Sequence, residues 1–135
     1  MDLGLQIADD CLQQYQAMRM DKKHRYIIYH TKNNKTIEIE KIGARDDTYE
    51  QFLNSLPQND SRFCVFDYEK KFEDGRINEK IIYIFWCPDT APVKVKMVSA
   101  STNQFFQNKI QGFALALQCN DLSSLDKDDL EKKIH

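Results

Sequence analysis

The chain has 135 residues, with 19 Lys or Arg against 21 Asp or Glu, and it carries a formal net charge of −2 at pH 7. A charge so close to zero excludes bulk attraction to nucleic acid or to an anionic membrane, because both require a strong positive field. The length suits one domain with a single core, and no apolar run is long enough to span a membrane. The N-terminus also lacks the basic and apolar layout of a signal peptide, so we expect a cytosolic protein.

The first half of the chain predicts alternating helices and strands. Asp9 is a suitable N-cap for the first helix, and the periodicity points Leu12, Tyr15 and Met18 inward. The elements expected here are a helix over 9–18, strands over 25–31 and 36–42, a helix from Asp46 or Asp47 to Leu56, and a strand over 62–68.

The second half contains an unbroken apolar run from Ile81 to Trp86, which is typical of a strand buried on both faces. Pro88 and Pro92 end this strand, and Pro92 can open a helix because its missing N–H would be unpaired there in any case. A turn at Asp74-Gly75 precedes the strand; a long helix to about 110, a strand over 113–118 and a charged helix over 125–134 follow it. This order predicts an α/β (α+β) fold in which helices cover both faces of a mixed sheet.

The long helix has two stripes at helical spacing. The stripe facing the sheet is expected to hold Val95, Val98, Thr102, Phe105 and Phe106. The neighbouring stripe, which the core does not need, consists of Lys94, Met97, Ser101, Gln104 and Asn108. Two lysines in the first turn oppose the positive end of the helix dipole. They could be ordinary solvated lysines, but Met97, which directly follows Lys96, indicates a docking strip in which an apolar anchor lies beside cations.

Catalytic and metal chemistry find little support in the sequence. The four cysteines are widely spaced, which indicates free buried thiols and not a metal site or a disulfide framework. Pairing of Cys64 or Cys87 with His30 in catalysis would require a closeness that the sequence cannot show. Asp67 and Glu69 could bind a cation, but they fit a solvated strand face better. We therefore expect no enzyme activity, no cofactor and no metal.

One long motif connects these elements to a known family. The motif is Trp86-Cys-Pro-Asp-Thr-Ala-Pro-Val-Lys-Val-Lys-Met-Val-Ser-Ala-Ser-Thr102. Further matches are Gly4-Leu-Gln-Ile-Ala-Asp-Asp10, Thr48-Tyr-Glu-Gln-Phe52, Leu56-Pro-Gln-Asn-Asp60 and Arg62-Phe-Cys-Val-Phe-Asp-Tyr68. Together they resemble the actin-depolymerising factor (ADF)/cofilin proteins, in family order and over almost the whole chain. The resemblance implies one ADF-homology domain over 1–135, with 1–5 as a flexible tail and a central five- or six-stranded mixed sheet between helices.

The resemblance also implies two actin-binding surfaces. The first would bind monomers as well as filaments, through Leu3, Gly4, Leu5, Ile7, Lys94, Lys96, Met97, Ser99, Ser101 and Gln104. The second would be needed for filaments only, through Arg76, Lys80, Glu131, Lys132 and His135. The partners implied are G-actin and F-actin, with severing and depolymerisation of filaments and a preference for ADP-actin, by a monomeric protein of the actin cytoskeleton.

Departures from the family pattern shape the remaining expectations. Relatives commonly carry a phosphorylated serine just before the position of Gly4, and this chain has Leu3 there, so that switch is expected to be absent. Relatives usually have Tyr where this chain has Ser99. The end of the long helix retains Lys109 as its one cation, so phosphoinositide binding is expected to be weak. Two alternatives stay open: a coactosin-like module that decorates filaments without severing, and a phosphoinositide-regulated scaffold.

Overall fold

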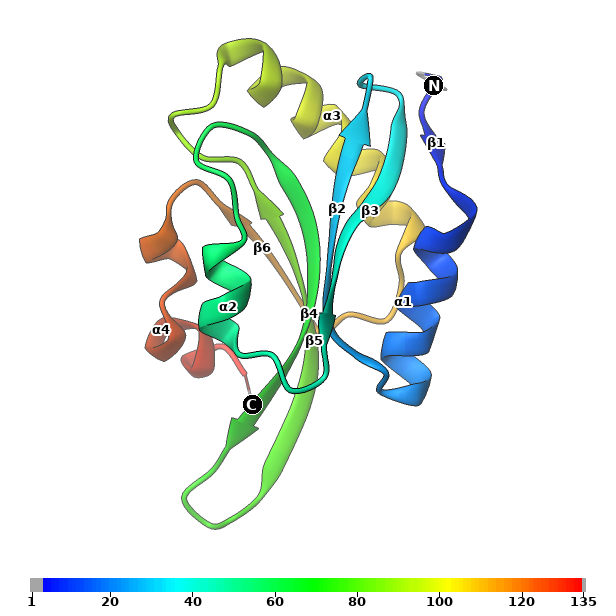
Figure 1. Ribbon diagram of the computed structural model, residues 1–135. Coiled ribbons are helices and arrows are strands. Elements are labelled where there is room, and N and C mark those ends of the chain that lie inside the picture. The colour runs from blue at the N-terminus through cyan, green and yellow to red at the C-terminus, as the bar shows by residue number, and fades with distance from the viewer. Residues whose placement is uncertain (1–3, 135) are drawn as a thin grey trace.

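The computed structural model describes residues 4–134 and contains one six-stranded sheet in the order β1-β3-β2-β4-β5-β6 (Figure 1). The strands are β1 (Gln6–Ile7), β2 (His24–Lys32), β3 (Thr36–Ala44), β4 (Arg62–Lys71), β5 (Ile77–Trp86) and β6 (Leu115–Cys119). The two outer strands run parallel to their neighbours, and the other pairs are antiparallel. The prediction of a mixed sheet is therefore confirmed.

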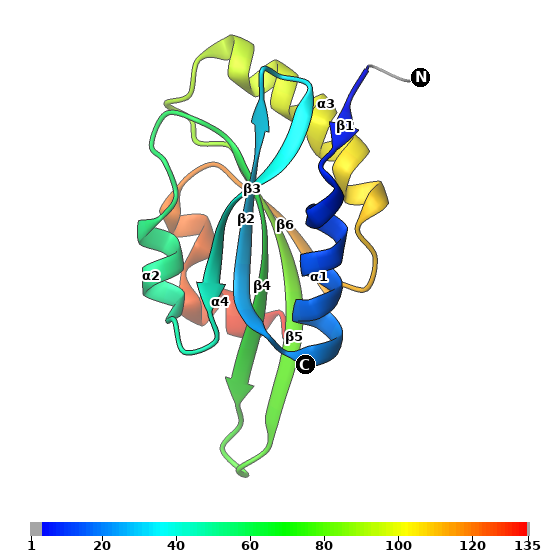
Figure 2. The same ribbon diagram turned by 45° about the vertical axis from the view of Figure 1, so that its right-hand side comes forward.

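Helices cover both faces of this sheet, as expected. The elements α1 (Asp9–Asp21) and α3 (Val93–Lys109) lie on one face. On the other face lie α2 (Tyr49–Asn54), the 3-10 helix η1 (Leu122–Leu125) and α4 (Lys127–Lys132), and the two views separate these layers clearly (Figure 2). No helix within residues 4–134 has both the length and the apolar composition needed to cross a bilayer.

The central strands β4 and β5 divide their side chains between two cores. Cys64, Phe66, Ile82, Ile84 and Trp86 pack with residues of α2 and α4. Phe63, Val65, Ile81, Tyr83 and Phe85 pack with residues of α1 and α3. Successive side chains of a strand point to opposite faces, so an unbroken apolar run fills both cores. The interpretation of Ile81–Trp86 as a strand buried on both faces is confirmed.

Two helix starts differ from the prediction. The N-cap of α1 is Ala8, whose N–H still donates to the Ile37 carbonyl of β3, so the helix begins directly after this contact; the alanine side chain has no polar group to cap it. Leu12 is 39% exposed, so the prediction that it points inward was wrong; the buried stripe is Cys11, Tyr15 and Met18. The cap of α2 is Thr48, not Asp46 or Asp47, since Thr48 and Gln51 form a capping box.

The C-terminal helix is also divided where one element was predicted. Asp121 caps η1 by accepting a hydrogen bond from the Ser124 N–H, and Asp126 caps α4 by accepting one from the Asp129 N–H. Each aspartate satisfies helix-start donors, so the chain starts a second helix instead of continuing one.

The β4–β5 hairpin is longer than the sequence suggested and projects from the body (Figure 1). The last rung shared by β2 and β4 is Tyr26 with Phe66, and the first shared by β5 and β6 is Ile82 with Leu115. Beyond these rungs, the residues of 67–71 and 77–81 have only each other as strand partners. A turn over 72–76, with Gly75 at a φ of +92°, closes the hairpin.

Candidate functional site

The start of α3 is fixed by the end of β5. The Cys87 N–H donates to the Cys119 carbonyl, and the Asp89 N–H donates to the Asn120 carbonyl, which ties this connection to the end of β6. The Trp86 indole N–H donates to the Pro57 carbonyl at 2.7 Å. Pro92 then serves as the N-cap of α3. The expectation that Pro92 opens the helix is confirmed, and the helix begins from a rigidly held loop.

The two faces of α3 follow the predicted stripes. Thr102 and Phe106 are buried, and the Phe106 ring packs edge-on against Tyr29 with ring centroids 4.8 Å apart. On the outer face Lys94, Ser101 and Gln104 are exposed. The Met97 side chain is 68% exposed although it is apolar. Helical periodicity alone therefore placed this methionine correctly on the surface.

Ser99 does not belong to that outer face. It is only 4% exposed, and its hydroxyl donates to the Val95 carbonyl at 2.6 Å. The Cys87 Sγ lies 3.7 Å from the same hydroxyl. Because a residue four positions after Val95 lies on the same stripe, Ser99 faces inward, and its prediction as a contact residue was wrong.

The first turn of α3 concentrates positive charge. It contains no acidic residue, and its N-cap makes no side-chain hydrogen bond. Lys94 is exposed and Lys96 is half-buried, and neither forms an ion pair with any other residue of 4–134. Unpaired helix N–H groups and the helix dipole add to the two cations. The result is a cationic helix end with an exposed apolar side chain.

A segment far away in sequence lies beside this helix. The Gln6 N–H donates to the Lys35 carbonyl, so β1 holds the N-terminal segment along β3. An open hollow of about 300 Å³ results between this segment, the β2–β3 turn and α3. Its lining is mainly apolar and small: Leu5, Asn34, Met97, Val98, Ser101 and Thr102.

The structure brings part of the predicted first surface together. Leu5, Met97 and Ser101 share the hollow, with Gly4 exposed just before Leu5. Ile7 instead packs against the core between the sheet and α1. Leu3 lies outside the described residues. The sequence reasoning missed Val93, which is 71% exposed one turn before Met97; its place directly after the helix-opening proline was the available signal.

The residues predicted for the second surface lie around the hairpin and α4. Arg76, at the hairpin turn, is exposed, bonds the Asp74 carboxylate at 2.7 Å and lies over the Phe72 ring. Lys80 is half-buried, and Lys132 is exposed on α4. His135 falls beyond the described residues. Figure 1 places the tip of the β4–β5 hairpin at the opposite end of the molecule from the start of α3, with α4 beside the body between them.

Lys70 connects the two parts of this second surface. Its ammonium group donates to the carbonyls of Glu131 and Ile134 at 2.6 and 2.8 Å. Glu131 lies in the last turn of α4 and Ile134 follows the end of that helix, and the Glu131 carbonyl also accepts from the Ile134 N–H at 3.2 Å. The hairpin and α4 are therefore held together by a cation that the sequence analysis did not single out.

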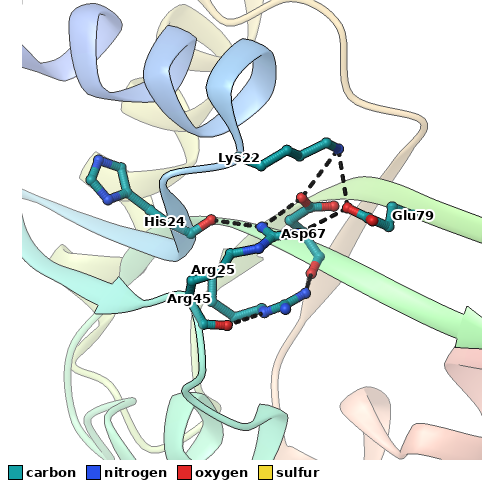
Figure 3. Close-up of polar contacts among 6 residues, drawn as sticks. All are labelled: Lys22, His24, Arg25, Arg45, Asp67 and Glu79. Carbon is teal, nitrogen blue, oxygen red and sulfur yellow. Dashed lines mark hydrogen bonds and ion pairs between the residues drawn. The ribbon is translucent and has the colours of Figure 1, made fainter.

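Asp67 corrects the interpretation of a solvated strand face. It is fully buried, and its Oδ2 accepts hydrogen bonds from Arg45 at 2.8 Å and from Lys22 at 3.4 Å (Figure 3). Glu69 is half-buried. Within 4–134 no group of three His, Cys, Asp or Glu residues is arranged to hold a metal ion. The Asp67 carboxylate thus bonds side chains inside the protein, from Lys22 and Arg45, which are both distant in sequence.

The Cys64 thiol is not a prepared nucleophile. This residue is buried, and burial raises its pKa well above the usual range of a thiol. Since the thiolate is the reactive form, such a thiol reacts slowly.

Comparison with known proteins agrees with this geometry. The family model described as cofilin/tropomyosin-type actin-binding protein matches residues 4–135. Actophorin from Acanthamoeba castellanii is 33% identical over 131 residues, which cover 96% of this chain and 94% of actophorin. The chain belongs to the ADF/cofilin family of actin-binding proteins. Actin-depolymerizing factor 4 from Oryza sativa subsp. japonica is 34% identical over 132 residues, 97% of this chain and 95% of that protein.

Solved structures place the same ADF/cofilin fold on this chain. Cofilin from Streptomyces griseoflavus matches with a TM-score of 0.84 at 32% identity, covering 94% of this chain and 96% of that one. Coactosin from Entamoeba histolytica matches with a TM-score of 0.80 but at 14% identity, so it shares the fold alone; the match covers 97% of this chain and 94% of coactosin. The family consists of actin-binding regulators and not of enzymes.

Proposed function

We propose that this ADF/cofilin-family chain binds actin monomers and filaments, severs and depolymerises filaments with a preference for ADP-actin, and so speeds actin turnover. In this proposal it acts as one ADF-homology domain over residues 1–135, as a monomer in the cytoplasm. The observation that carries it is the cationic start of α3, where exposed Met97 directly follows Lys96 and neither Lys94 nor Lys96 forms an ion pair within residues 4–134.

The first surface suits an apolar cleft with acidic groups at its rim. Val93 is 71% exposed and Met97 is 68% exposed. These apolar side chains can be buried only against a partner. Lys94 and Lys96 form no ion pair within the described part of the chain, so they can meet carboxylates without first breaking one there. At many interfaces a buried apolar side chain fixes the position of the partner, and charged groups steer and orient the partner as it approaches.

The second surface supports a separate filament contact. A monomer that occupies the α3 surface leaves the far end of the molecule free, and the hairpin presents Arg76 and Lys80 there (Figure 1). A neighbouring subunit exists only in a filament, so contacts at this end add affinity for filaments alone. Two linked contacts raise the overall affinity above either one.

Severing follows from differential affinity. A protein that binds one filament state more tightly shifts the population of subunits toward that state. Boundaries between bound and bare stretches then join two subunit geometries, and those boundaries are the weak points. No bond of the nucleotide is broken by this chain in the proposed mechanism.

The alternative is that the chain decorates actin filaments without severing them, and the fold that it shares with coactosin is compatible with this alternative. A phosphoinositide-regulated scaffold is less favoured, because the last turn of α3 contains Lys109 as its one basic residue. Few cations near an anionic surface give weak binding, at about 1 kcal/mol for each.

Imaging of single actin filaments with the purified chain tests the proposal. Severing predicts fragmentation that rises and then falls with coverage, because boundaries are most numerous at partial coverage. Decoration without breaks would replace the proposal by the coactosin-like alternative, and bare filaments would remove actin filaments as the partner. A variant with Arg76 and Lys80 both changed to Ala is the matched control, since it keeps the α3 surface intact.

A further inference from the structure

The β4–β5 hairpin leaves the sheet at a cluster of charges that links five elements (Figure 3). Asp67 of β4 is the first residue beyond the last rung that β4 shares with β2, and Glu79 of β5 lies within the free part of the hairpin. The cations come from the body: Lys22 caps the end of α1, and Arg45 directly follows β3. The cluster therefore spans the point where the hairpin stops being part of the sheet.

Arg45 is the main bridge. One of its terminal nitrogens donates to Asp67 Oδ2 at 2.8 Å, and the other donates to Glu79 Oε2 at 2.8 Å. The first nitrogen also reaches the His24 carbonyl at 3.1 Å, which ties the bridge to the start of β2. A planar guanidinium group can engage two carboxylates at once in a fixed geometry, whereas a single ammonium group is a point charge.

Two more cations complete the attachment. Lys22 Nζ lies 3.4 Å from Asp67 Oδ2 and 3.2 Å from Glu79 Oε2, so it repeats the contact pair of Arg45. Arg25 donates to the Asp67 carbonyl at 2.9 Å and to the Arg45 carbonyl at 3.0 Å. Burial acts to raise the pKa of Glu79, but the hydrogen bonds and charges of Lys22 and Arg45 outweigh it and leave that pKa below its usual value.

The burial of Asp67 makes this attachment obligatory. Its side chain is fully buried, and its Oδ1 has no hydrogen-bond partner within the described part of the chain. A buried carboxylate without partners is costly, so the charge depends on the cations at Oδ2. If the hairpin swung away from the body, Asp67 would lose Arg45 and Lys22 together.

We propose that Asp67, Glu79, Arg45 and Lys22 are positioning residues for filament binding, because they fix the direction in which the hairpin presents Arg76 and Lys80. The inference rests on the proposed filament contact. None of the four residues needs to touch actin in this account. Loosening the cluster lowers the fraction of molecules with a correctly placed hairpin, and it leaves the α3 surface unchanged.

The central test compares Arg45→Met with Arg62→Met. Arg62 is the matched control: it lies at the opposite end of β4, pairs with Glu40 at 2.9 Å and Asp60 at 2.8 Å, and its side chain is only 13% exposed. For each variant the Kd for filaments, the Kd for actin monomers and the hydrogen exchange of hairpin amides 69–80 are measured. If one molecule in ten keeps the hairpin in place, Arg45→Met raises the filament Kd about tenfold.

The pattern across these readouts decides the inference. Arg45→Met is expected to leave the monomer Kd unchanged and to speed exchange in the hairpin, while Arg62→Met leaves the ratio of the two Kd values and the hairpin exchange unchanged. Equal weakening of both Kd values would overturn the inference. Weaker filament binding without faster hairpin exchange would overturn it too, since Arg45 would then contact the filament directly.

Two further variants keep the test decisive if Arg45→Met fails to fold. Glu79→Gln removes one carboxylate without leaving Asp67 unpaired, and it is expected to change the same readouts in the same direction. Arg45→Lys is expected to retain only part of the filament affinity, because an ammonium group acts as a point charge and lacks the fixed two-nitrogen geometry of the guanidinium group. A Glu79→Gln protein with wild-type exchange and wild-type filament affinity would remove the proposed role.

The outcome is separable from the proposed function. If the unmodified chain does not bind filaments, the proposed function fails, and hairpin exchange in Arg45→Met and Glu79→Gln still decides whether the cluster fixes the hairpin. If the unmodified chain binds filaments and these variants match it in every readout, only the positioning role fails.

Discussion

The two predicted actin surfaces are built in different ways. The α3 surface stands on a helix whose inner side is packed into the core, with Phe106 against Tyr29 and Phe63. The hairpin surface stands on two strand segments that pair only with each other, and hydrogen bonds and ion pairs connect them to the body. Hydrophobic burial therefore fixes the first surface, whereas the second relies on polar contacts in addition to the burial of Tyr68 and Ile81 at the base of the hairpin.

The two surfaces should therefore respond differently to mutation. The outer side chains of α3 can be truncated without disturbing the contacts that hold the helix, so binding and stability should separate cleanly. The hairpin can lose function in two ways, through its own contact residues or through the residues that hold it.

Changing Lys94 and Lys96 together to Ala is expected to abolish binding of both monomers and filaments. Loss of two charge contacts at an interface amounts to about 3 kcal/mol or more, which is over a hundredfold in Kd. The melting temperature should hardly change, because neither lysine has an ion pair within the described residues. Co-sedimentation, monomer titration and thermal unfolding measure the three quantities. Full binding by this variant would remove the α3 surface from the proposal.

Changing Arg76 and Lys80 together to Ala is expected to weaken filament binding by about tenfold, or roughly 1.4 kcal/mol for the pair, and to spare monomer binding. The effect is smaller because Arg76 already engages Asp74 and Phe72 within the hairpin. Parallel titrations with monomers and filaments check the split. Equal losses in the two titrations would contradict the separation of the surfaces.

Lys70→Met is expected to lower the free energy of unfolding by about 1–3 kcal/mol, because the carbonyls of Glu131 and Ile134 lose a charged donor. Filament binding should weaken less than in the Arg76 and Lys80 variant, and monomer binding should stay unchanged. Chemical denaturation and the same titrations measure these effects, with Lys71→Met at the exposed neighbour as the stability control. An unchanged stability would show that α4 does not depend on this contact.

The smallest effect concerns the thiols. Burial is the main cause that raises the pKa of Cys11 and of Cys119 to about 11, and it raises that of Cys64 further. At pH 7 to 8 these three are almost entirely protonated and shielded, so an alkylating reagent is expected to modify half-buried Cys87 first. Mass spectrometry of partly alkylated protein gives the order. Cys87 adjoins Ser99, so its labelling rate also reports on the packing of α3. Earlier labelling at Cys11 would show that the N-terminal helix opens more readily than α3.

Much of the fold could be predicted because its signals are local. The change from an apolar run to helical spacing at Pro88 and Pro92 located β5 and α3, and the spacing within α3 placed Met97 outside. Ser99 shows the limit of carrying a residue over by resemblance, since its own spacing from Val95 places it inside. Leu12 was misplaced because the true stripe of α1 begins one residue earlier, at Cys11.

The sequence by itself determined the order of helices and strands, the family and the cationic start of α3, since each depends on neighbours within a few turns of the chain. Only the folded chain shows that Leu5 and Met97 line the same hollow and that buried Asp67 bonds Lys22 and Arg45. Periodicity indicates which side of a helix or strand faces inward, but it does not indicate which charged residue from elsewhere in the chain packs against that side. A carboxylate on a strand has the same pattern whether water or a guanidinium group faces it, and only the folded chain distinguishes them.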